Sequence, residues 1–169
     1  VSPTAQLPAL FTVVAANTTI DGLSITSFNG PAIALLPPPS SPTGSVGDDI
    51  WGNFIGVASF DPTSFNDLPL GPNTPLDPNL WTHINALGNG EGILVESSNN
   101  RIGGSLPPDR NIIQGNHGDG VQLTTATGTG NLVEGNYVLD NDGDGVHITT
   151  SNNLIGETIG AGPGGAGNI

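Results

Sequence analysis

The sequence of 169 residues contains no cysteine, so disulfides cannot hold the fold and cysteine usage indicates no redox compartment. It also contains no methionine and begins at Val1 without an initiator. We therefore expect a mature secreted chain whose signal peptide has been removed, with a chosen sequence boundary as the alternative. No apolar run approaches the roughly 18 residues of a membrane-spanning helix, so no membrane insertion is expected.

Basic residues are almost absent. Arg101 and Arg110 are the only two, against 15 Asp and Glu, and the formal net charge is −13. Binding to a nucleic-acid backbone needs several clustered cations, so nucleic acid is excluded as a main partner. Anionic membrane surfaces are disfavoured for the same reason. An acidic surface of this kind favours divalent cations instead.

Short apolar runs, separated by clusters of Gly, Asn, Asp, Ser and Thr, are the regular feature of the chain. Runs of three to five residues have the length of strands, and no apolar stripe with helical spacing lasts long enough for a helix. The sequence therefore predicts many short strands and no long helix. The clearest runs are Phe11–Val14, Leu23–Ile25, Ile93–Val95, Val121–Leu123 and Val146–Ile148.

Internal repetition indicates how these strands are arranged. NIIQGN at 111–116 resembles NLVEGN at 131–136, and WGNFI at 51–55 resembles EGNYV at 134–138. Six upstream positions recur in the same order and spacing near the end of the chain. These are Ile20, Gly22, Ile25, Gly30, Ile33 and Leu35, which match Val133, Gly135, Val138, Gly143, Val146 and Ile148. Repetition at fixed phase is typical of a solenoid and is not required by an antiparallel sandwich.

Successive coils of a solenoid stack about 4.8 Å apart, so that equivalent residues lie over one another. The pairs Ile113 with Val133, Val121 with Val146 and Ile93 with Val121 suggest coils of roughly 20 to 30 residues. The asparagines of the Gly-Asn pairs are expected to form one ladder along the axis, made of Asn53, Asn116 and Asn136. The varying coil length favours an all-β, right-handed parallel β-helix that forms a single domain over residues 1–169.

Two proline-rich stretches, 36–47 and 58–80, interrupt the repeats. Proline cannot donate to a central ladder of hydrogen bonds, so we expect both stretches to be loop insertions that project from the stack. Such loops either carry a binding function or are surface insertions. In the second case the later loop is packed by its own Phe60, Phe65, Leu68 and Trp81.

Several phrases resemble a known family. NNRIGG at 99–104, RNIIQGN at 110–116, GDGV at 118–121 and the segment 130–137 are similar to phrases of secreted bacterial right-handed β-helix repeat proteins. These proteins belong to the broad pectate-lyase-like superfamily. The resemblance implies a β-helix in an extracellular or cell-surface location, and it says little about activity.

The sequence shows no evident set of catalytic residues. Polysaccharide cleavage by this superfamily needs paired acids, or a basic residue with cations. Asp48 and Asp49 are adjacent on a predicted strand and point to opposite faces, so a polar corner is the preferred interpretation. A lyase base would have to be one of the two arginines. The three histidines, at 83, 117 and 147, are irregularly spaced, and we expect no enzyme.

A Ca²⁺ site is one interpretation of Asp140, Asp142 and Asp144, which have the alternating acid spacing of the first half of a calcium loop. The position of the final bidentate acid is taken by Ser151, so the motif is incomplete. The alternative is that Asp-Gly forms the turn into the next strand, as at Asp119. Ca²⁺ is the only cofactor that the sequence suggests.

Neither end of the repeats shows a capping helix or polar coil, and an uncapped solenoid exposes unpaired strand edges. The leading functional hypothesis is a non-catalytic extracellular structural rod that associates head to tail with itself into a filament or surface layer. The alternatives are a carbohydrate-binding or carbohydrate-cleaving module, with glycans as partners, or an adhesin segment. The residues expected at an end-to-end contact are Leu10, Phe11, Val13, Asn168 and Ile169.

Overall fold

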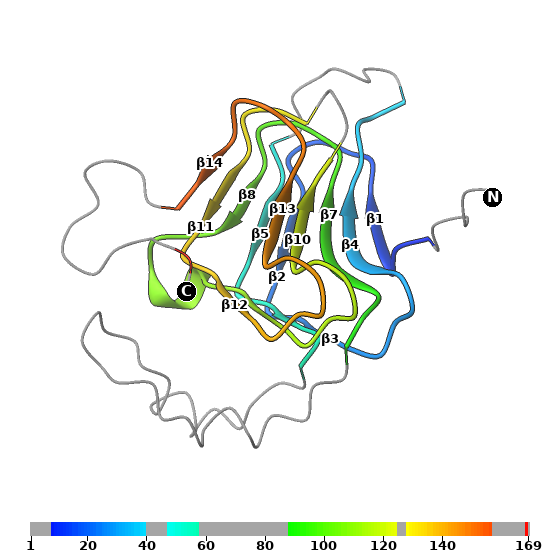
Figure 1. Cartoon of the computed structure of the whole chain (residues 1–169). Coiled ribbons are helices and arrows are strands. Elements are labelled where there is room, and N and C mark those ends of the chain that lie inside the picture. Colours follow the sequence, from blue (N-terminus) through cyan, green and yellow to red (C-terminus); the bar gives the residue numbers. More distant parts are fainter. Residues whose placement is uncertain (1–7, 40–46, 58–87, 125–127, 157–167, 169) are drawn as a thin grey trace.

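The computed structural model describes residues 8–39, 47–57, 88–124, 128–156 and 168, and its strands form three parallel sheets (Figure 1). Sheet A contains β1 (Phe11–Val13), β4 (Pro31–Leu35), β7 (Glu91–Val95), β10 (Val121–Leu123) and β13 (Val146–Ile148). Sheet B contains β2 (Thr19–Asp21), β5 (Asp49–Trp51), β8 (Arg101–Gly103), β11 (Leu132–Glu134) and β14 (Leu154–Ile155). Sheet C contains β3 (Ser24–Ile25), β6 (Phe54–Ile55), β9 (Ile112–Gln114) and β12 (Tyr137–Leu139).

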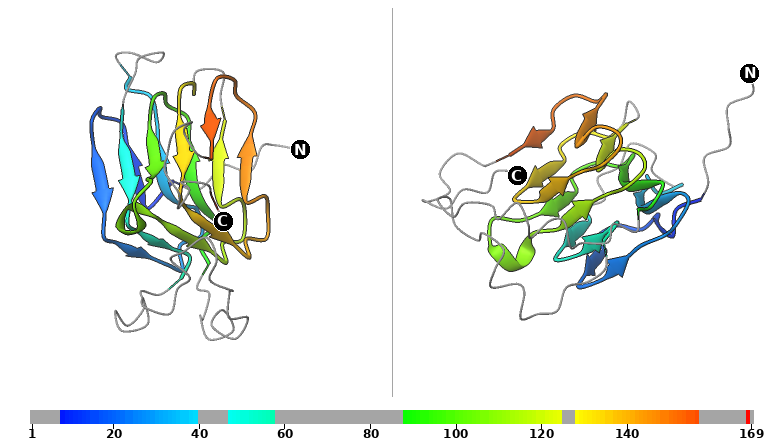
Figure 2. Two further views of the ribbon diagram at one scale, coloured as in Figure 1. Left: turned by 90° about the vertical axis from the view of Figure 1, so that its left-hand side faces the viewer. Right: turned by 60° about the horizontal axis from the view of Figure 1, so that its bottom comes forward.

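The chain visits sheets A, B and C in turn, and we call each such passage a rung. Rung 1 is β1, β2 and β3, and rung 5 begins with β13 and β14. Every strand pairs in parallel with its equivalent in the neighbouring rung, so the rungs follow one another along the stack (Figure 2). The prediction of an all-β chain built from stacked parallel strands is therefore confirmed.

The core lies between the three sheets, because one hydrophobic cluster contains residues of all of them. The register places equivalent side chains over one another in columns. In sheet A one column runs from Phe11 through Ile33, Ile93 and Val121 to Val146. The neighbouring column runs from Val13 through Leu35, Val95 and Leu123 to Ile148.

The long-range repeat in the sequence is confirmed by this register. Ile20 reaches Val133 through Ile50 and Ile102, which occupy the same column of sheet B. One proposed coil is wrong, however: Ile113 lies in sheet C and pairs with Val138, whereas Val133 lies in sheet B. The phrase around Ile113 resembles the one around Val133 because each side of a rung needs a short apolar strand followed by a Gly-Asn corner.

Helix is nearly absent, as predicted. The only helix among the described residues is the short 3-10 helix η3 (Pro107–Asp109), which is too short to produce a periodic apolar pattern. Within the same described ranges, no helix has the length and apolar character that crossing a bilayer requires. Of the two predicted loop insertions, residues 40–46 and the whole of 58–80 lie outside the described part of the chain.

Two glycines with positive φ provide a test of the close stacking of rungs. A Cβ added at Gly22 (φ 66°) would meet no atom within 4 Å, whereas a Cβ added at Gly103 (φ 86°) would collide with the Glu134 carbonyl oxygen of the next rung. We expect Gly22→Ala to cost about 1–2 kcal/mol, from backbone strain alone. Gly103→Ala should cost about 3 kcal/mol or more, because it adds overpacking to the same strain.

Chemical denaturation of the two variants measures this difference. Equal losses of unfolding free energy at Gly22 and Gly103 would contradict the close approach of β8 and β11.

Candidate functional site

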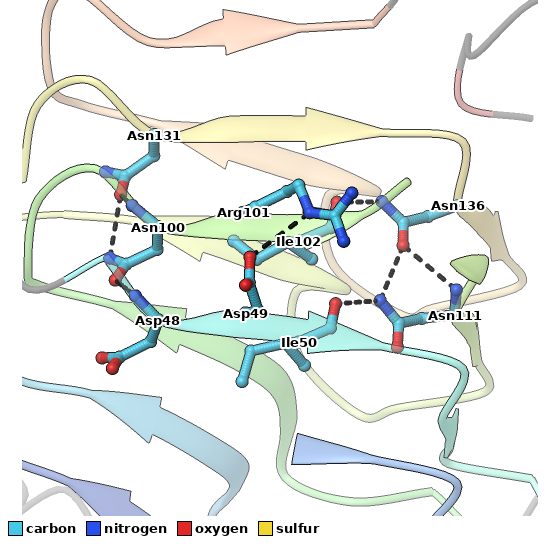
Figure 3. Close-up of polar contacts among 9 residues, drawn as sticks. All are labelled: Asp48, Asp49, Ile50, Asn100, Arg101, Ile102, Asn111, Asn131 and Asn136. Atoms are coloured by element: carbon cyan, nitrogen blue, oxygen red, sulfur yellow. Dashed lines mark hydrogen bonds and ion pairs between the residues drawn. The ribbon is translucent and has the colours of Figure 1, made fainter. Parts of the chain in front are cut away.

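Asparagine side chains form a ladder at the corner between sheets B and C (Figure 3). Asn53, Asn111 and Asn136 are buried at the same position of rungs 2, 3 and 4. Asn53 Nδ2 donates to Asn111 Oδ1 at 3.1 Å, and Asn111 Nδ2 donates to Asn136 Oδ1 at 2.8 Å. Asn136 Nδ2 continues the ladder to Asn168 Oδ1 at 3.1 Å. The amides therefore link the rungs along the stack.

Each ladder amide also forms hydrogen bonds with a backbone N–H and a backbone carbonyl of the preceding rung. Asn111 Nδ2 donates to the carbonyl oxygen of Ile50 at 2.9 Å, and Asn111 Oδ1 accepts from the backbone N–H of Asn53 at 3.0 Å. An amide supplies a donor and an acceptor together in this geometry. A buried polar group without partners costs about 1–3 kcal/mol, so the full set of bonds explains why these asparagines can be buried.

The other two corners carry ladders of the same kind. Between sheets C and A, Asn89 Nδ2 donates to Asn116 Oδ1 at 3.1 Å, and Asn116 Nδ2 donates to Asn141 Oδ1 at 2.9 Å. Between sheets A and B, Asn100 Nδ2 donates to Asn131 Oδ1 at 2.9 Å. The structure thus has three parallel ladders.

The single ladder of Asn53, Asn116 and Asn136 that the sequence suggested is wrong in one member. Asn53 and Asn136 share the corner between sheets B and C, with Asn111 between them. Asn116 belongs to the corner between sheets C and A, one side further along the rung. The error arises because Gly-Asn occurs at all three corners, and the dipeptide does not indicate which sheet follows.

Asp48 is the exception among the ladder residues. It occupies the rung 2 position of the ladder between sheets A and B, where its Oδ1 accepts from the backbone N–H of Thr18 at 2.8 Å. Its own N–H donates to Asn100 Oδ1 at 3.0 Å. The side chain is 0% exposed, and its Oδ2 finds no hydrogen-bond partner among the described residues. Burial raises the pKa of the Asp48 carboxyl, hydrogen bonds from Thr18 oppose that shift, and the charge of Asp49 adds to it.

The two arginines, which the sequence offered as the only bases for a lyase, both have partners. Arg101 Nε lies 3.3 Å from Asp49 Oδ1 on the outer face of sheet B, where both side chains are partly exposed (Figure 3). Such a surface pair contributes at most about 1 kcal/mol. Arg110 Nη1 donates to the Tyr137 hydroxyl at 3.0 Å, and its guanidinium lies 5.4 Å from the centre of that ring.

The acids predicted to bind Ca²⁺ face different partners. Asp140 Oδ2 accepts from Gln114 Nε2 at 3.2 Å, and Asp142 Oδ2 lies 3.4 Å from His117 Nδ1. Asp144 Oδ2 lies 3.0 Å from His147 Nδ1. Among the described residues these three carboxylates do not form one group of potential metal ligands. Ca²⁺ binding by them stays a prediction.

The side chains that the structure does bring together at this corner are Asp119, Asp144 and His147, with one ligand atom of each within 4.8 Å of the others. Asp119 Oδ1 accepts from the backbone N–H of Asp144 at 2.7 Å, and Asp119 Oδ2 accepts from Gln122 Nε2 at 2.9 Å. Two carboxylates and an imidazole could hold a divalent cation of the transition series. The same contacts also explain Asp119 as a residue that fixes the turn of the next rung.

The predicted end-to-end residues lie at the two ends of the stack. Leu10 is 49% exposed and Phe11 is 40% exposed at β1, whose outer edge has no partner among the described strands, whereas Val13 is buried. Asn168 lies at the other end, where it accepts from Asn136 and donates to the Val133 carbonyl oxygen at 2.9 Å. Ile169 lies outside the described residues.

The aromatic residues of the second predicted loop lie outside the described ranges, namely Phe60, Phe65 and Trp81, together with His83. Trp51 is described, at the end of β5, and is half-buried. No family model, characterised protein or solved structure matches the chain.

The sequence did not assign Asn100, Asn111 or Asn131 to a ladder. Each directly precedes a strand, in the phrase Asn-x-Ile or Asn-x-Val. That position is the available signal, because an asparagine before a short apolar run recurs at every rung from 3 onward.

Removal of one ladder amide should be costly. Asn111→Ala removes the acceptor of the Asn53 backbone N–H and the amide donor to the Ile50 carbonyl, and it takes one hydrogen bond from each of the two neighbouring amides, so we expect a loss of about 3 kcal/mol or more. Asn29→Ala, at an exposed corner, should change stability by less than about 0.5 kcal/mol. Urea denaturation compares the two, and a loss at Asn111 no larger than that at Asn29 would refute a structural role for the ladder.

Asp119→Ala should lower the free energy of unfolding by about 1–3 kcal/mol, because Asp144 N–H and Gln122 lose their acceptor. Thermal unfolding is measured with EDTA and with added Zn²⁺ or Ca²⁺. A destabilisation that persists in EDTA supports the turn, whereas one that appears only with added metal would assign the residue to cation binding instead.

Proposed function

We propose that this chain is a right-handed parallel β-helix of one domain, a non-catalytic extracellular structural rod that associates head to tail with copies of itself. The cyclic order of the sheets supports the β-helix, since each rung places one strand in A, B and C. A right-handed path is supported by the general preference of crossovers between parallel strands. The resemblance of the Asn-rich phrases to secreted β-helix repeat proteins supports the extracellular location.

The proposed association is supported by the positions of exposed large apolar side chains at the two ends of the stack. The core columns of sheet A are buried along the stack, but one column in each end rung finishes in a partly exposed side chain: Phe11 is 40% exposed in rung 1 and Ile148 is 44% exposed in rung 5. Their column neighbours Ile33 and Leu123 are 0% exposed. Each end thus exposes a side chain of the kind that the next rung would cover.

The backbone supports the same contact. β1 and β13 are the two edges of sheet A, and β2 and β14 are the two edges of sheet B. An unpaired edge strand is a template for another strand, and here both edges have the parallel direction of the sheet. A second copy placed after rung 5 would extend the existing pairing, which gives a heterologous contact that does not close.

Single charges at either end should block the association. We expect Phe11→Glu and Ile148→Glu each to weaken self-association at least tenfold, because a carboxylate would be buried in an apolar contact. Leu106→Glu is the matched control, since Leu106 is 59% exposed beside η3 and away from both ends. Sedimentation velocity and negative-stain microscopy over a concentration series measure the assemblies.

A mixture of the two end variants tests the head-to-tail geometry directly. Each variant keeps one intact end, so the equimolar mixture should form pairs but no longer chains. Added salt should strengthen wild-type assembly, because it screens the repulsion between chains of net charge −13. A wild type that stays monomeric at all concentrations, in Ca²⁺ and in EGTA alike, would refute the proposal.

A further inference from the structure

Among the described ladder positions of rungs 2 to 5, one has a carboxyl group where the others have an amide. Asp48 in rung 2 lies between Thr18 of rung 1 and Asn100 of rung 3, as Asn53 in the neighbouring ladder lies between Leu23 and Asn111. The two residues share their acceptor role: Asp48 Oδ1 binds the Thr18 N–H at 2.8 Å, and Asn53 Oδ1 binds the Leu23 N–H at 3.0 Å.

They differ in the second atom of the side chain. Asn53 Nδ2 donates to Asn111 Oδ1 and to the Ile20 carbonyl oxygen. In Asp48 the second atom is Oδ2, which is buried and without a partner among the described residues. Asn100 Oδ1, the next acceptor of this ladder, receives the Asp48 N–H. In the other ladders the equivalent oxygen receives two donors, a backbone N–H and an amide Nδ2.

We propose that Asp48 occupies the ladder as a neutral carboxylic acid whose Oδ2–H donates to Asn100 Oδ1, so that rungs 1, 2 and 3 are joined more firmly in acid than at neutral pH. A protonated carboxyl reproduces an amide, with one oxygen as acceptor and one O–H as donor. The ionised form is acceptor-only, and it would face the amide oxygen of Asn100 without a donor. This inference does not depend on end-to-end association.

The surroundings favour the neutral form. The side chain is 0% exposed, and burial is the largest cause that raises its pKa, with the like charge of Asp49 acting in the same direction. Hydrogen bonds from Thr18 act against it. Charged groups on neighbouring elements are Asp21 at the far end of β2, Glu96 after β7, and Arg101 on β8, whose Nε is directed to Asp49.

The sign of the pH effect follows from the raised pKa. Between the ordinary aspartate pKa and the raised one, the folded chain binds more protons at this site than the unfolded chain does. The stabilisation by Asp48 is therefore complete below the ordinary pKa and is lost as pH rises through the raised value. Ionisation at higher pH leaves a buried negative charge at the contact between the first rungs.

The test exchanges acid and amide between two ladders. In Asp48→Asn the amide completes the ladder, and in Asn53→Asp the acid is moved to the same rung of the neighbouring ladder. We expect the unfolding equilibrium constant of the wild type, relative to Asp48→Asn, to rise by up to tenfold per pH unit between the two pKa values. In Asn53→Asp the unfolding equilibrium constant should show a second rise with pH, caused by the acid at position 53. Asp49→Asn removes the neighbouring like charge, which is a smaller cause of the raised pKa than burial, so it should narrow the dependence towards lower pH without abolishing it.

A direct measurement uses the unchanged protein. In a carbon-detected NMR titration of the side-chain carboxyls, Asp48 Cγ should titrate at a higher pH than the ordinary aspartate pKa. Asp48 titrating at or below the ordinary aspartate pKa, or an Asp48→Asn variant with the pH dependence of the wild type, would overturn the proposal. Because the titration needs no substitution, a variant that fails to fold does not prevent the decision.

Discussion

The structure depends on the vertical alignment of equivalent residues in successive rungs. Parallel pairing fixes the register of each sheet, and the asparagine ladders fix the same register at the corners, where sheets do not pair. A shift of one residue in any strand would turn its apolar side chains outward and separate the corner amide from its neighbour. Core columns and amide ladders therefore favour the same register.

This mutual constraint explains an unusual composition. Corners are tight, and the chain uses glycine with positive φ at positions such as Gly103 and Gly135, where the neighbouring rung leaves no room for a Cβ. Strands are only two to five residues long, so each contributes little area to the core. Stability comes from the repetition of the same contacts, as in other quasi-one-dimensional folds. Glycines at such corners are in this sense structural.

The sequence predicted the strands, their parallel stacking and the long-range repeat, because these follow from apolar periodicity. It could not place Asn116, since a Gly-Asn pair occurs at all three corners. The regular spacing of Asp140, Asp142 and Asp144 suggested a cation site at these acids. The sequence did not predict the group formed by Asp119, Asp144 and His147. That grouping joins two rungs, and a contact between rungs is visible in the sequence only when the register is already known. The sequence indicated that Asp48 lies at a corner. It did not indicate that Oδ2 is buried and without a partner among the described residues, because this depends on the position of Asp48 in the ladder.

The ladders have a direction, and this makes the two ends of the stack chemically different. At each corner a backbone N–H of one rung donates to a side-chain oxygen of the next. In rung 1 the ladder positions are taken by Thr18, Leu23 and Phe28, none of which has a side-chain amide.

A copy placed after rung 5 would therefore offer no amide oxygen to Asn141, Asn153 or Asn168. Contact between copies would rely on the strand edges and on the apolar columns that end at Phe11 and Ile148. Such a contact lacks the ladder hydrogen bonds that link internal rungs. An assembly of this chain would therefore dissociate between copies before the rungs within one copy separated.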